Sequence, residues 1–186
     1  MLLFVGLGNP TPDSENNRHN VGFKIIDSIN KKFSLSKQKP KFKGLLTTGT
    51  IGNKKVYAIK PLTFMNNSGT AIKELIDYFK IDAKDVFVFH DDMDIDFGKI
   101  KAKFGGSSAG HNGIDSIDKF IGKDYSRVRI GIGKPENKMS VSDFVLNDFS
   151  DDEQEHLEKI THNIIDSIAI LIDKKLDLFS SKVNNN

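Results

Sequence analysis

Short apolar runs alternate with stretches of helical periodicity along this chain, and no other feature of the sequence restricts its fold as much. Residues 2–7 form a continuous apolar run that stops at Gly8-Asn9-Pro10, which predicts a buried strand leading into a turn. Residues 86–89 and 128–132 predict two more buried strands, and residues 100–104 alternate as a half-buried strand does. Strands alternating with helices are typical of an α/β fold, so we expect a three-layer α/β/α domain with a twisted, mixed, mostly parallel sheet flanked by helices.

The helical stretches carry apolar residues three and four positions apart. They cover, in chain order, residues 21–33, 72–79, 114–121 and 157–172. Ser68 is placed to cap the second helix, and Ser150 with Glu153 matches a capping box at the start of the last one, which we expect to be one long helix. Residues 45–51 and 55–59 flank a Gly-Asn turn and predict a β-hairpin.

The chain has 186 residues, the length of one ordinary domain, and contains neither an internal repeat nor a linker. We therefore expect a single domain over residues 1–186, with residues 184–186 frayed. The opening apolar run is too short for a signal peptide or a membrane span, so we expect a cytoplasmic protein with no membrane partner. The absence of cysteine excludes a disulfide scaffold, a thiol nucleophile and a cysteine-ligated metal.

The formal charge is only +2, but it is unevenly distributed. Residues 151–186 carry four lysines and eight acidic residues, whereas residues 1–150 carry 23 basic and 17 acidic residues. Any nucleic-acid-binding surface is therefore expected within the first 150 residues.

Two motifs begin in this sequence but are incomplete. Gly6-Leu7-Gly8 opens like a dinucleotide-binding fingerprint, but Thr11 stands where the third glycine belongs and Pro10 obstructs a helix start. An Asp-x-Asp-x-Asp run from Asp92 resembles the opening of a calcium loop, but the glycine comes one position late and Lys103 occupies the twelfth position. We expect neither a dinucleotide nor a calcium site.

A third motif is complete and supplies an alternative function. Gly106-Ser107-Ser108-Ala109-Gly110 matches the nucleophile elbow of serine hydrolases and lies between a predicted strand and a predicted helix. In that alternative Ser108 is the nucleophile, and His156 or His162 is the base. Both histidines fall in the terminal amphipathic helix, and the strand before the loop is rich in lysine, so a flexible Gly/Ser loop is the competing interpretation.

Small polar side chains gather at predicted turns, strand ends and helix starts. They belong to Asn9, Arg18-His19-Asn20, Asn66-Asn67-Ser68, Asp91 and His111-Asn112-Gly113. Each asparagine taken singly has an ordinary explanation as a turn or cap residue. Ligands of such sheets bind beyond the carboxyl ends of the strands, which makes these groups candidates for one shared site.

Five ordered motifs are similar to those of bacterial-type peptidyl-tRNA hydrolases. They are Val5-Gly6-Leu7-Gly8-Asn9-Pro10, Arg18-His19-Asn20-Val21-Gly22-Phe23, Pro61-Leu62-Thr63-Phe64-Met65-Asn66-Asn67-Ser68-Gly69, His90-Asp91-Asp92-Met93-Asp94 and Gly110-His111-Asn112-Gly113. A sixth run, residues 127–133, also resembles that family. The resemblance extends from residue 4 to about residue 149. It implies an enzyme that hydrolyses the ester between the peptide and the 3′-terminal ribose of peptidyl-tRNA and so releases tRNA for translation.

The resemblance implies that His19 is the catalytic histidine and Asp91 its orienting carboxylate. A neutral imidazole can take a proton from the attacking water, a role worth about 10²–10⁴ in rate. A carboxylate on the other ring nitrogen fixes the tautomer and stabilises the imidazolium of the transition state. A helix start near His19 opposes that cation, so the two influences on its basicity have opposite signs.

The resemblance also implies residues that hold the aminoacyl end. Asn9 matches the residue that distinguishes blocked from unblocked aminoacyl ends near the ribose–ester region. Asn66 and Asn112 match asparagines whose carboxamides can donate to a peptide carbonyl or a developing oxyanion. Phe64 and Met65 match positions that line the site, with ordinary core packing as the alternative.

Two basic residues match family positions that bind the tRNA 5′-phosphate. These are Lys103 and Arg129, whose contact is independent of sequence and sensitive to salt. Lys99 and Lys101 share a strand face with Lys103, either as part of this patch or as guards of an edge strand. Ser14 matches a tRNA-contacting position but replaces the family's tyrosine, so it cannot reproduce an aromatic contact.

The resemblance thus implies a monomeric enzyme that needs no metal, cofactor or covalent intermediate and whose partner is the acceptor end of peptidyl-tRNA. A short amphipathic segment, residues 139–149, is a candidate cover for the peptide channel. A non-catalytic RNA-binding relative is a second possibility, but such a protein should have lost His19 or Asp91, and both are present. The third is the Ser108 esterase, which a Ser108→Ala substitution separates from the first.

Overall fold

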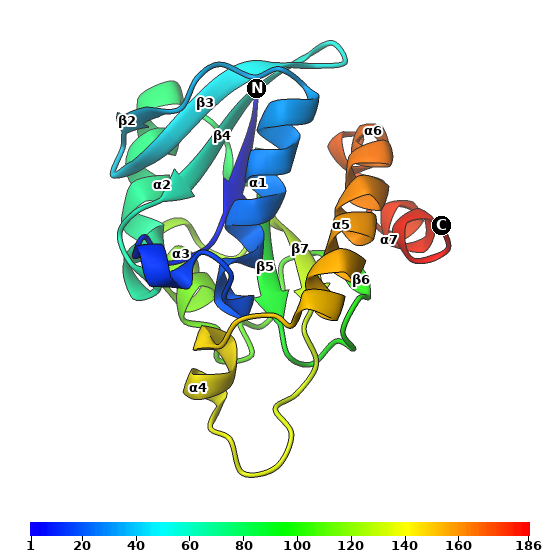
Figure 1. Cartoon of the computed structure of the whole chain (residues 1–186). Helices are drawn as coiled ribbons and strands as arrows, with labels where there is room; N and C mark the ends of the chain where they lie inside the picture. The colour runs from blue at the N-terminus through cyan, green and yellow to red at the C-terminus, as the bar shows by residue number, and fades with distance from the viewer.

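The structure, a computed structural model, describes residues 1–186 and is built on one seven-stranded sheet (Figure 1). In chain order the strands are β1 (Leu2–Gly6), β2 (Lys39–Lys41), β3 (Gly44–Ile51), β4 (Lys54–Pro61), β5 (Val86–Asp92), β6 (Ile100–Phe104) and β7 (Ser126–Gly131). Their order across the sheet is β2-β3-β4-β1-β5-β7-β6. β4, β1, β5 and β7 run parallel, whereas β3 and β6 run antiparallel to their neighbours. The expected mixed, mostly parallel sheet is confirmed.

Helices cover both faces of this sheet, as the three-layer expectation requires. They are α1 (Val21–Lys32), α2 (Ser68–Phe79), α3 (Asn112–Ile121), α4 (Val141–Leu146), α5 (Asp151–Asp166), α6 (Ile168–Ile172) and α7 (Leu176–Asn184). Four short 3-10 turns are η1 (Pro12–Ser14), η2 (Arg18–Asn20), η3 (Met65–Asn67) and η4 (Ala83–Asp85). No helix combines the length and the apolar content needed to cross a bilayer.

The apolar residues form one core on each face of the sheet. In β1, Leu2 and Phe4 face the core made with α1, α5, α6 and α7, while Leu3 and Val5 face the core made with α2 and α3. Successive strand residues point to opposite faces, so a strand covered on both sides must be apolar throughout. This explains the continuous apolar run that opens the sequence.

The stripe of apolar residues predicted as one long helix over residues 157–172 belongs to two helices, α5 and α6, and the apolar pattern continues in a third, α7. The chain breaks at Ser167, between α5 and α6, and again around Lys174, which has a φ of +61°. All three helices line the same core, so the stripe continues across both breaks. The predicted capping box is confirmed, since Ser150 and Glu153 each accept the other's backbone N–H through their side chains.

Two expectations about helix ends are wrong. Asn184 is not frayed, because its side chain accepts from the backbone N–H of Ile100 at 2.9 Å and donates to the carbonyl of Ile100 at 2.8 Å. α7 is thereby attached to the edge strand β6. Ser68 does not cap α2 but is its first residue, and its hydroxyl donates to the carbonyl of Met65, while Asn67 holds the capping position.

Candidate active site

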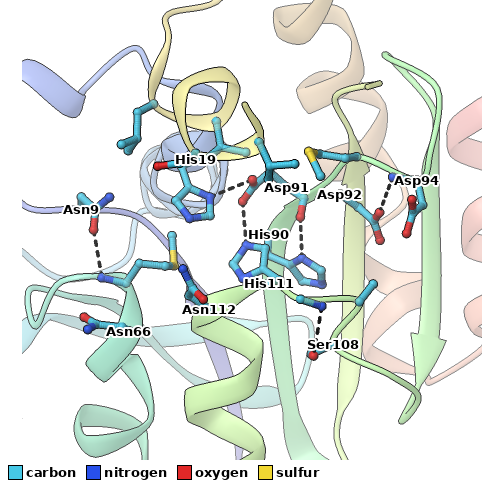
Figure 2. Close-up of a pocket in the computed structure, with 18 of the residues that line it drawn as sticks. Asn9, His19, Asn66, His90, Asp91, Asp92, Asp94, Ser108, His111 and Asn112 are labelled. Carbon is cyan, nitrogen blue, oxygen red and sulfur yellow. Dashed lines mark hydrogen bonds and ion pairs between the residues drawn. The ribbon is translucent and has the colours of Figure 1, made fainter. Parts of the chain in front are cut away.

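The carboxyl ends of the central parallel strands open into a cavity of about 790 Å³. Its walls come from the ends of β1 and β5, from η2 and η3, from the loop between β6 and α3, and from α4 (Figure 2). The polar residues gathered from turns, strand ends and helix starts of the sequence that line it are Asn9, His19, Asn66, Asp91, His111 and Asn112. Phe64 and Met65 line it too. The structure therefore brings these side chains, from distant parts of the chain, to one place.

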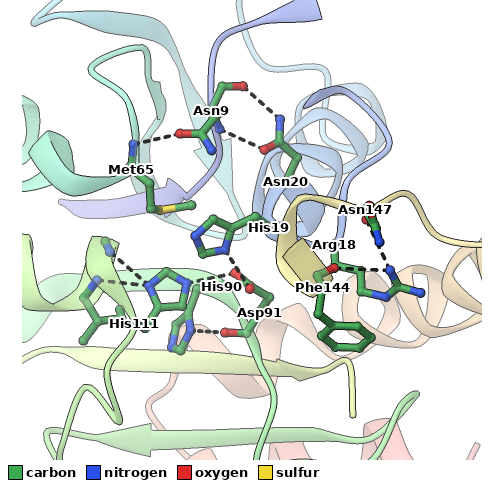
Figure 3. A network of polar contacts seen from close by, with 12 residues as sticks. Asn9, Arg18, His19, Asn20, Met65, His90, Asp91, His111, Phe144 and Asn147 are labelled. Atoms are coloured by element: carbon green, nitrogen blue, oxygen red, sulfur yellow. Dashed lines mark hydrogen bonds and ion pairs between the residues drawn. The ribbon is translucent and has the colours of Figure 1, made fainter. Parts of the chain in front are cut away.

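A glycine at the start of α1 brings His19 to the end of β5. A Cβ atom at Gly22 would lie 2.3 Å from the carbonyl oxygen of Phe89, so any other residue would push α1 away from the strand. With glycine there, His19 in η2 places its Nδ1 2.8 Å from Oδ2 of Asp91 (Figure 3). A carboxylate only accepts hydrogen bonds, so Nδ1 carries the hydrogen and Nε2 carries the lone pair. That Nε2 has no protein partner.

Asp91 accepts hydrogen bonds from two histidines at once. Its Oδ1 lies 2.8 Å from Nε2 of His111, the residue that precedes α3, and its side chain is only 2% exposed. Burial raises the pKa of Asp91, but attraction to His19 and His111 and the hydrogen bonds from both outweigh burial and hold that pKa well below its ordinary value. Asp91 is therefore a fixed carboxylate shared by two imidazoles.

His19, Asp91 and His111 also have the composition of a metal site, since their ligand atoms lie within 4.8 Å of one another. A metal on Nε2 of His111 requires the ring hydrogen to sit on Nδ1. Nδ1 instead accepts from the backbone N–H groups of Gly113 at 3.1 Å and Ile114 at 3.3 Å. These donors oppose a hydrogen on Nδ1, so the residues around the trio favour a proton network over a bound metal.

His90 precedes Asp91 but does not join the trio through its side chain. Its Nδ1 donates to the backbone carbonyl of Asp91 at 2.8 Å, and its Nε2 is buried with no partner. Burial, followed by the influence of His111, lowers the pKa of His90 to about 3. This imidazole is therefore neutral wherever His19 can act as a base.

The side chain of Asn9 is fixed in one orientation by its neighbours. Its Oδ1 accepts from the backbone N–H of Met65 at 2.9 Å, which leaves its amide hydrogens for the cavity (Figure 3). Asn20 holds the backbone of Asn9 on the other side, accepting from its N–H at 2.8 Å and donating to its carbonyl at 2.9 Å. Asn9 is thus a positioned hydrogen-bond donor.

The segment before α2 presents an aromatic ring in a strained conformation. Phe64 has a φ of +60°, a region that residues with side chains rarely adopt, and its side chain is 54% exposed. Met65 beside it is buried, while Asn66 and Asn112 are exposed in the cavity wall. Strain that keeps an apolar ring in solvent is typical of a binding surface.

Three predicted tRNA contacts lie outside the cavity. Lys103 on β6 and Arg129 on β7 are on one face of the sheet, because Lys103 pairs with Arg127 and Arg129 pairs with Lys101. Ser14 is buried in η1, and its hydroxyl pairs with that of Thr11 at 2.6 Å. Ser14 therefore lies outside the cavity, and its hydroxyl is already paired within its own turn.

The serine-hydrolase alternative lacks the two bases that the sequence analysis assigned to it. Ser108 lines the cavity, and its hydroxyl accepts from the backbone N–H of Gly110 at 3.3 Å within its own loop. His156 packs against Phe97, and His162 lies in a groove between α1 and α5. Neither histidine lines the cavity that holds Ser108.

Sequence reasoning missed two contributions to this site and anticipated a third. His111 is the second donor to Asp91, Asn20 holds the backbone of Asn9, and α4 contributes Val141 and Val145 to the cavity wall. The first two belong to motifs that the sequence analysis singled out, but nothing in the spacing showed which members face each other. The helix lies within residues 139–149, the segment predicted to cover the channel.

Comparison with known proteins gives one consistent result. The model of the peptidyl-tRNA hydrolase family matches residues 3–186. A peptidyl-tRNA hydrolase from Pelagibacter ubique is 80% identical over 185 residues, covering 100% of both chains, and one from Bartonella henselae is 44% identical, covering 99% of this chain and 95% of its own. The crystal structure of peptidyl-tRNA hydrolase from Acinetobacter baumannii superposes with a TM-score of 0.92 at 32% identity, covering 100% of this chain and 95% of that one.

Proposed function

This chain belongs to the peptidyl-tRNA hydrolase family, and we propose that it releases tRNA from peptidyl-tRNA by an attack of water for which His19 is the general base. The observation that carries the proposal is the 2.8 Å contact between Nδ1 of His19 and Oδ2 of Asp91. It puts the hydrogen on Nδ1 and leaves the lone pair of Nε2 free to take a proton from water.

Asp91 supports this role by its charge. As His19 takes the proton of the attacking water, the imidazolium that forms lies next to a buried carboxylate that stays ionised. The water oxygen forms a bond to the ester carbon, and the proton then passes to the leaving 3′-oxygen of the ribose. A buried carboxylate lowers the energy of the imidazolium without itself taking a proton.

Carboxamide N–H groups are proposed to stabilise, by hydrogen bonds, the negative charge that develops on the ester oxygen. Asn66 and Asn112 stand exposed in the cavity wall, and the amide group of Asn9 is held with its hydrogens toward the cavity. Donors fixed before the reaction stabilise a developing oxyanion without reorganising during it. We assign Asn9 to the ribose side of the ester, since it follows β1 and is hydrogen-bonded to the backbone of Met65, the residue next to the exposed Phe64.

The tRNA itself is proposed to contact two further regions. The exposed ring of Phe64 can face the terminal base or ribose, as aromatic side chains do with single-stranded RNA. Lys103 and Arg129, on one face of the edge of the sheet, can bind the 5′-phosphate of the acceptor end.

Release of free tRNA from N-blocked and from unblocked aminoacyl-tRNA, measured in EDTA, tests this proposal. We expect the wild type to cleave only the blocked substrate, His19→Ala to lose about 10²- to 10⁴-fold in kcat, and Ser108→Ala to keep nearly all activity. Loss of activity with Ser108→Ala and its retention with His19→Ala would mean that the serine mechanism operates.

A further inference from the structure

We propose that His111 is a positioning residue for this reaction, which uses the start of α3 to fix the charge and orientation of Asp91. The inference rests on the proposed role of His19 as the base. It follows from the three hydrogen bonds of His111, two to the helix and one to the carboxylate, which leave only one arrangement of ring hydrogens.

The start of α3 determines the tautomer of His111. The ring occupies the N-cap position, and its Nδ1 accepts from the backbone N–H groups of Gly113 and Ile114 (Figure 3). Free N–H groups at a helix N-terminus need such an acceptor. The hydrogen of the neutral ring must therefore sit on Nε2, where it points at Oδ1 of Asp91 over 2.8 Å.

The hydrogen bond from His111 to Asp91 reduces the electrostatic stabilisation that this carboxylate gives to a positive charge on His19. One carboxylate oxygen accepts from each histidine, so the charge is divided between two donors. His111 can only donate in this geometry, whereas His19 is free to change its charge during the reaction. Without the donor, the carboxylate acts on His19 alone and favours the imidazolium form of His19 more strongly.

The packing around the trio keeps this arrangement fixed. The side chains of His19, Asp91 and His111 are all less than 10% exposed, and the rings of His90 and His111 meet edge to face at 5.0 Å between centroids. The remaining titratable and charged groups near the trio are His90 and Asp92 on β5, Asp94 after it, Arg127 and Arg129 on β7, and Arg18 in η2. None of these groups hydrogen-bonds to the carboxylate of Asp91, so His111 is its one side-chain partner besides His19.

Two substitutions separate the donor from the cap. His111→Asn keeps a side-chain oxygen that caps α3, because asparagine is a favoured cap residue, but its amide is too short to replace Nε2. His111→Gln carries an amide nitrogen about as far from the backbone as Nε2, so it keeps the donor to Asp91 and loses the cap. The pH dependence of kcat/KM on N-blocked aminoacyl-tRNA, from about pH 5 to pH 8 with spontaneous hydrolysis subtracted, reports the base of the free enzyme.

We expect His111→Asn to move the acidic limb of the profile upward by about one pH unit, so that kcat/KM below the limb falls roughly tenfold. His111→Gln should leave the limb at the wild-type position while lowering the melting temperature. An exposed histidine on α5 supplies the matched control, since His162→Asn should leave both limb and rate unchanged.

A His111→Asn limb that stays at the wild-type position would overturn the inference, and so would a His111→Gln limb that moves as far as that of His111→Asn. If His19→Ala, assayed alongside, remains inactive, those results would still be consistent with His19 as the general base. An active His19→Ala would instead overturn the proposed function together with the role of His111.

Discussion

His90 on β5 and His111 before α3 are in contact, but their imidazole rings are held in different ways. His111 is kept as a donor by its hydrogen bonds, whereas His90 is kept neutral by burial, which lowers its pKa to about 3. A residue that titrates normally when the chain is unfolded but not when it is folded makes stability depend on pH. We therefore expect His90 to contribute to the acid sensitivity of the fold.

The sign of this dependence follows from which state binds the proton. Between pH 6.5 and about 3 the unfolded chain protonates His90 and the folded chain does not, so acid favours unfolding. Asp91 adds to the effect only near and below its ordinary pKa of 3.8. We expect the free energy of unfolding in urea to fall by about 2 kcal/mol from pH 6.5 to pH 4.5 through His90, and this part to vanish in His90→Asn. An equal fall in both proteins would show that other groups are responsible.

At the residue scale the sequence indicated which polar side chains meet in the cavity but not how they are paired. Asn9, His19, Asn66, Asp91 and Asn112 all line the cavity, as their places after strands and before helices suggested. The pairing depends on tertiary distances of a few tenths of an ångström, which no spacing encodes. The double hydrogen bond to Asp91 and the orientation of the Asn9 amide are therefore visible only in the structure.

At the scale of elements, the periodicity of apolar residues predicted that a helix or strand exists better than it predicted where that element begins and ends. Every strand except β2, and the helices α1, α2 and α3, lie where the sequence patterns placed them. The last stripe, residues 157–172, was mistaken for one helix because α5 and α6 face the same core, and periodicity alone does not detect a break at a polar residue such as Ser167. The strand β2 lacks any apolar pattern, since all three of its residues are exposed at the sheet edge.

At the scale of the whole molecule, the uneven charge predicts where RNA binds. The first 150 residues carry the excess of basic groups, and Lys103 and Arg129 lie on one face at the edge of the sheet. We expect Lys103→Gln and Arg129→Gln each to raise KM for peptidyl-tRNA and to reduce the slope of log KM against log salt by about 1.

Lys54→Gln is the matched control for these variants. Lys54 is exposed at the start of β4, and therefore at the end of the sheet opposite the cavity. Its substitution should leave the salt slope unchanged. If the slope of log KM against log salt falls equally in all three variants, the salt dependence comes from the overall charge of the protein rather than from contacts of Lys103 and Arg129.

The most direct test of the central claim is the single-turnover rate of Asp91→Asn on N-blocked aminoacyl-tRNA. The N–H of His111 holds the amide oxygen at the position of Oδ1, so the amide nitrogen faces Nδ1 of His19. Nδ1 must then accept, the ring hydrogen moves to Nε2, and the lone pair that takes the proton from water is lost. We expect a loss of about 10³- to 10⁴-fold with little change in KM. A rate within about threefold of the wild type would contradict the account, because the base would then not depend on the tautomer that Asp91 sets.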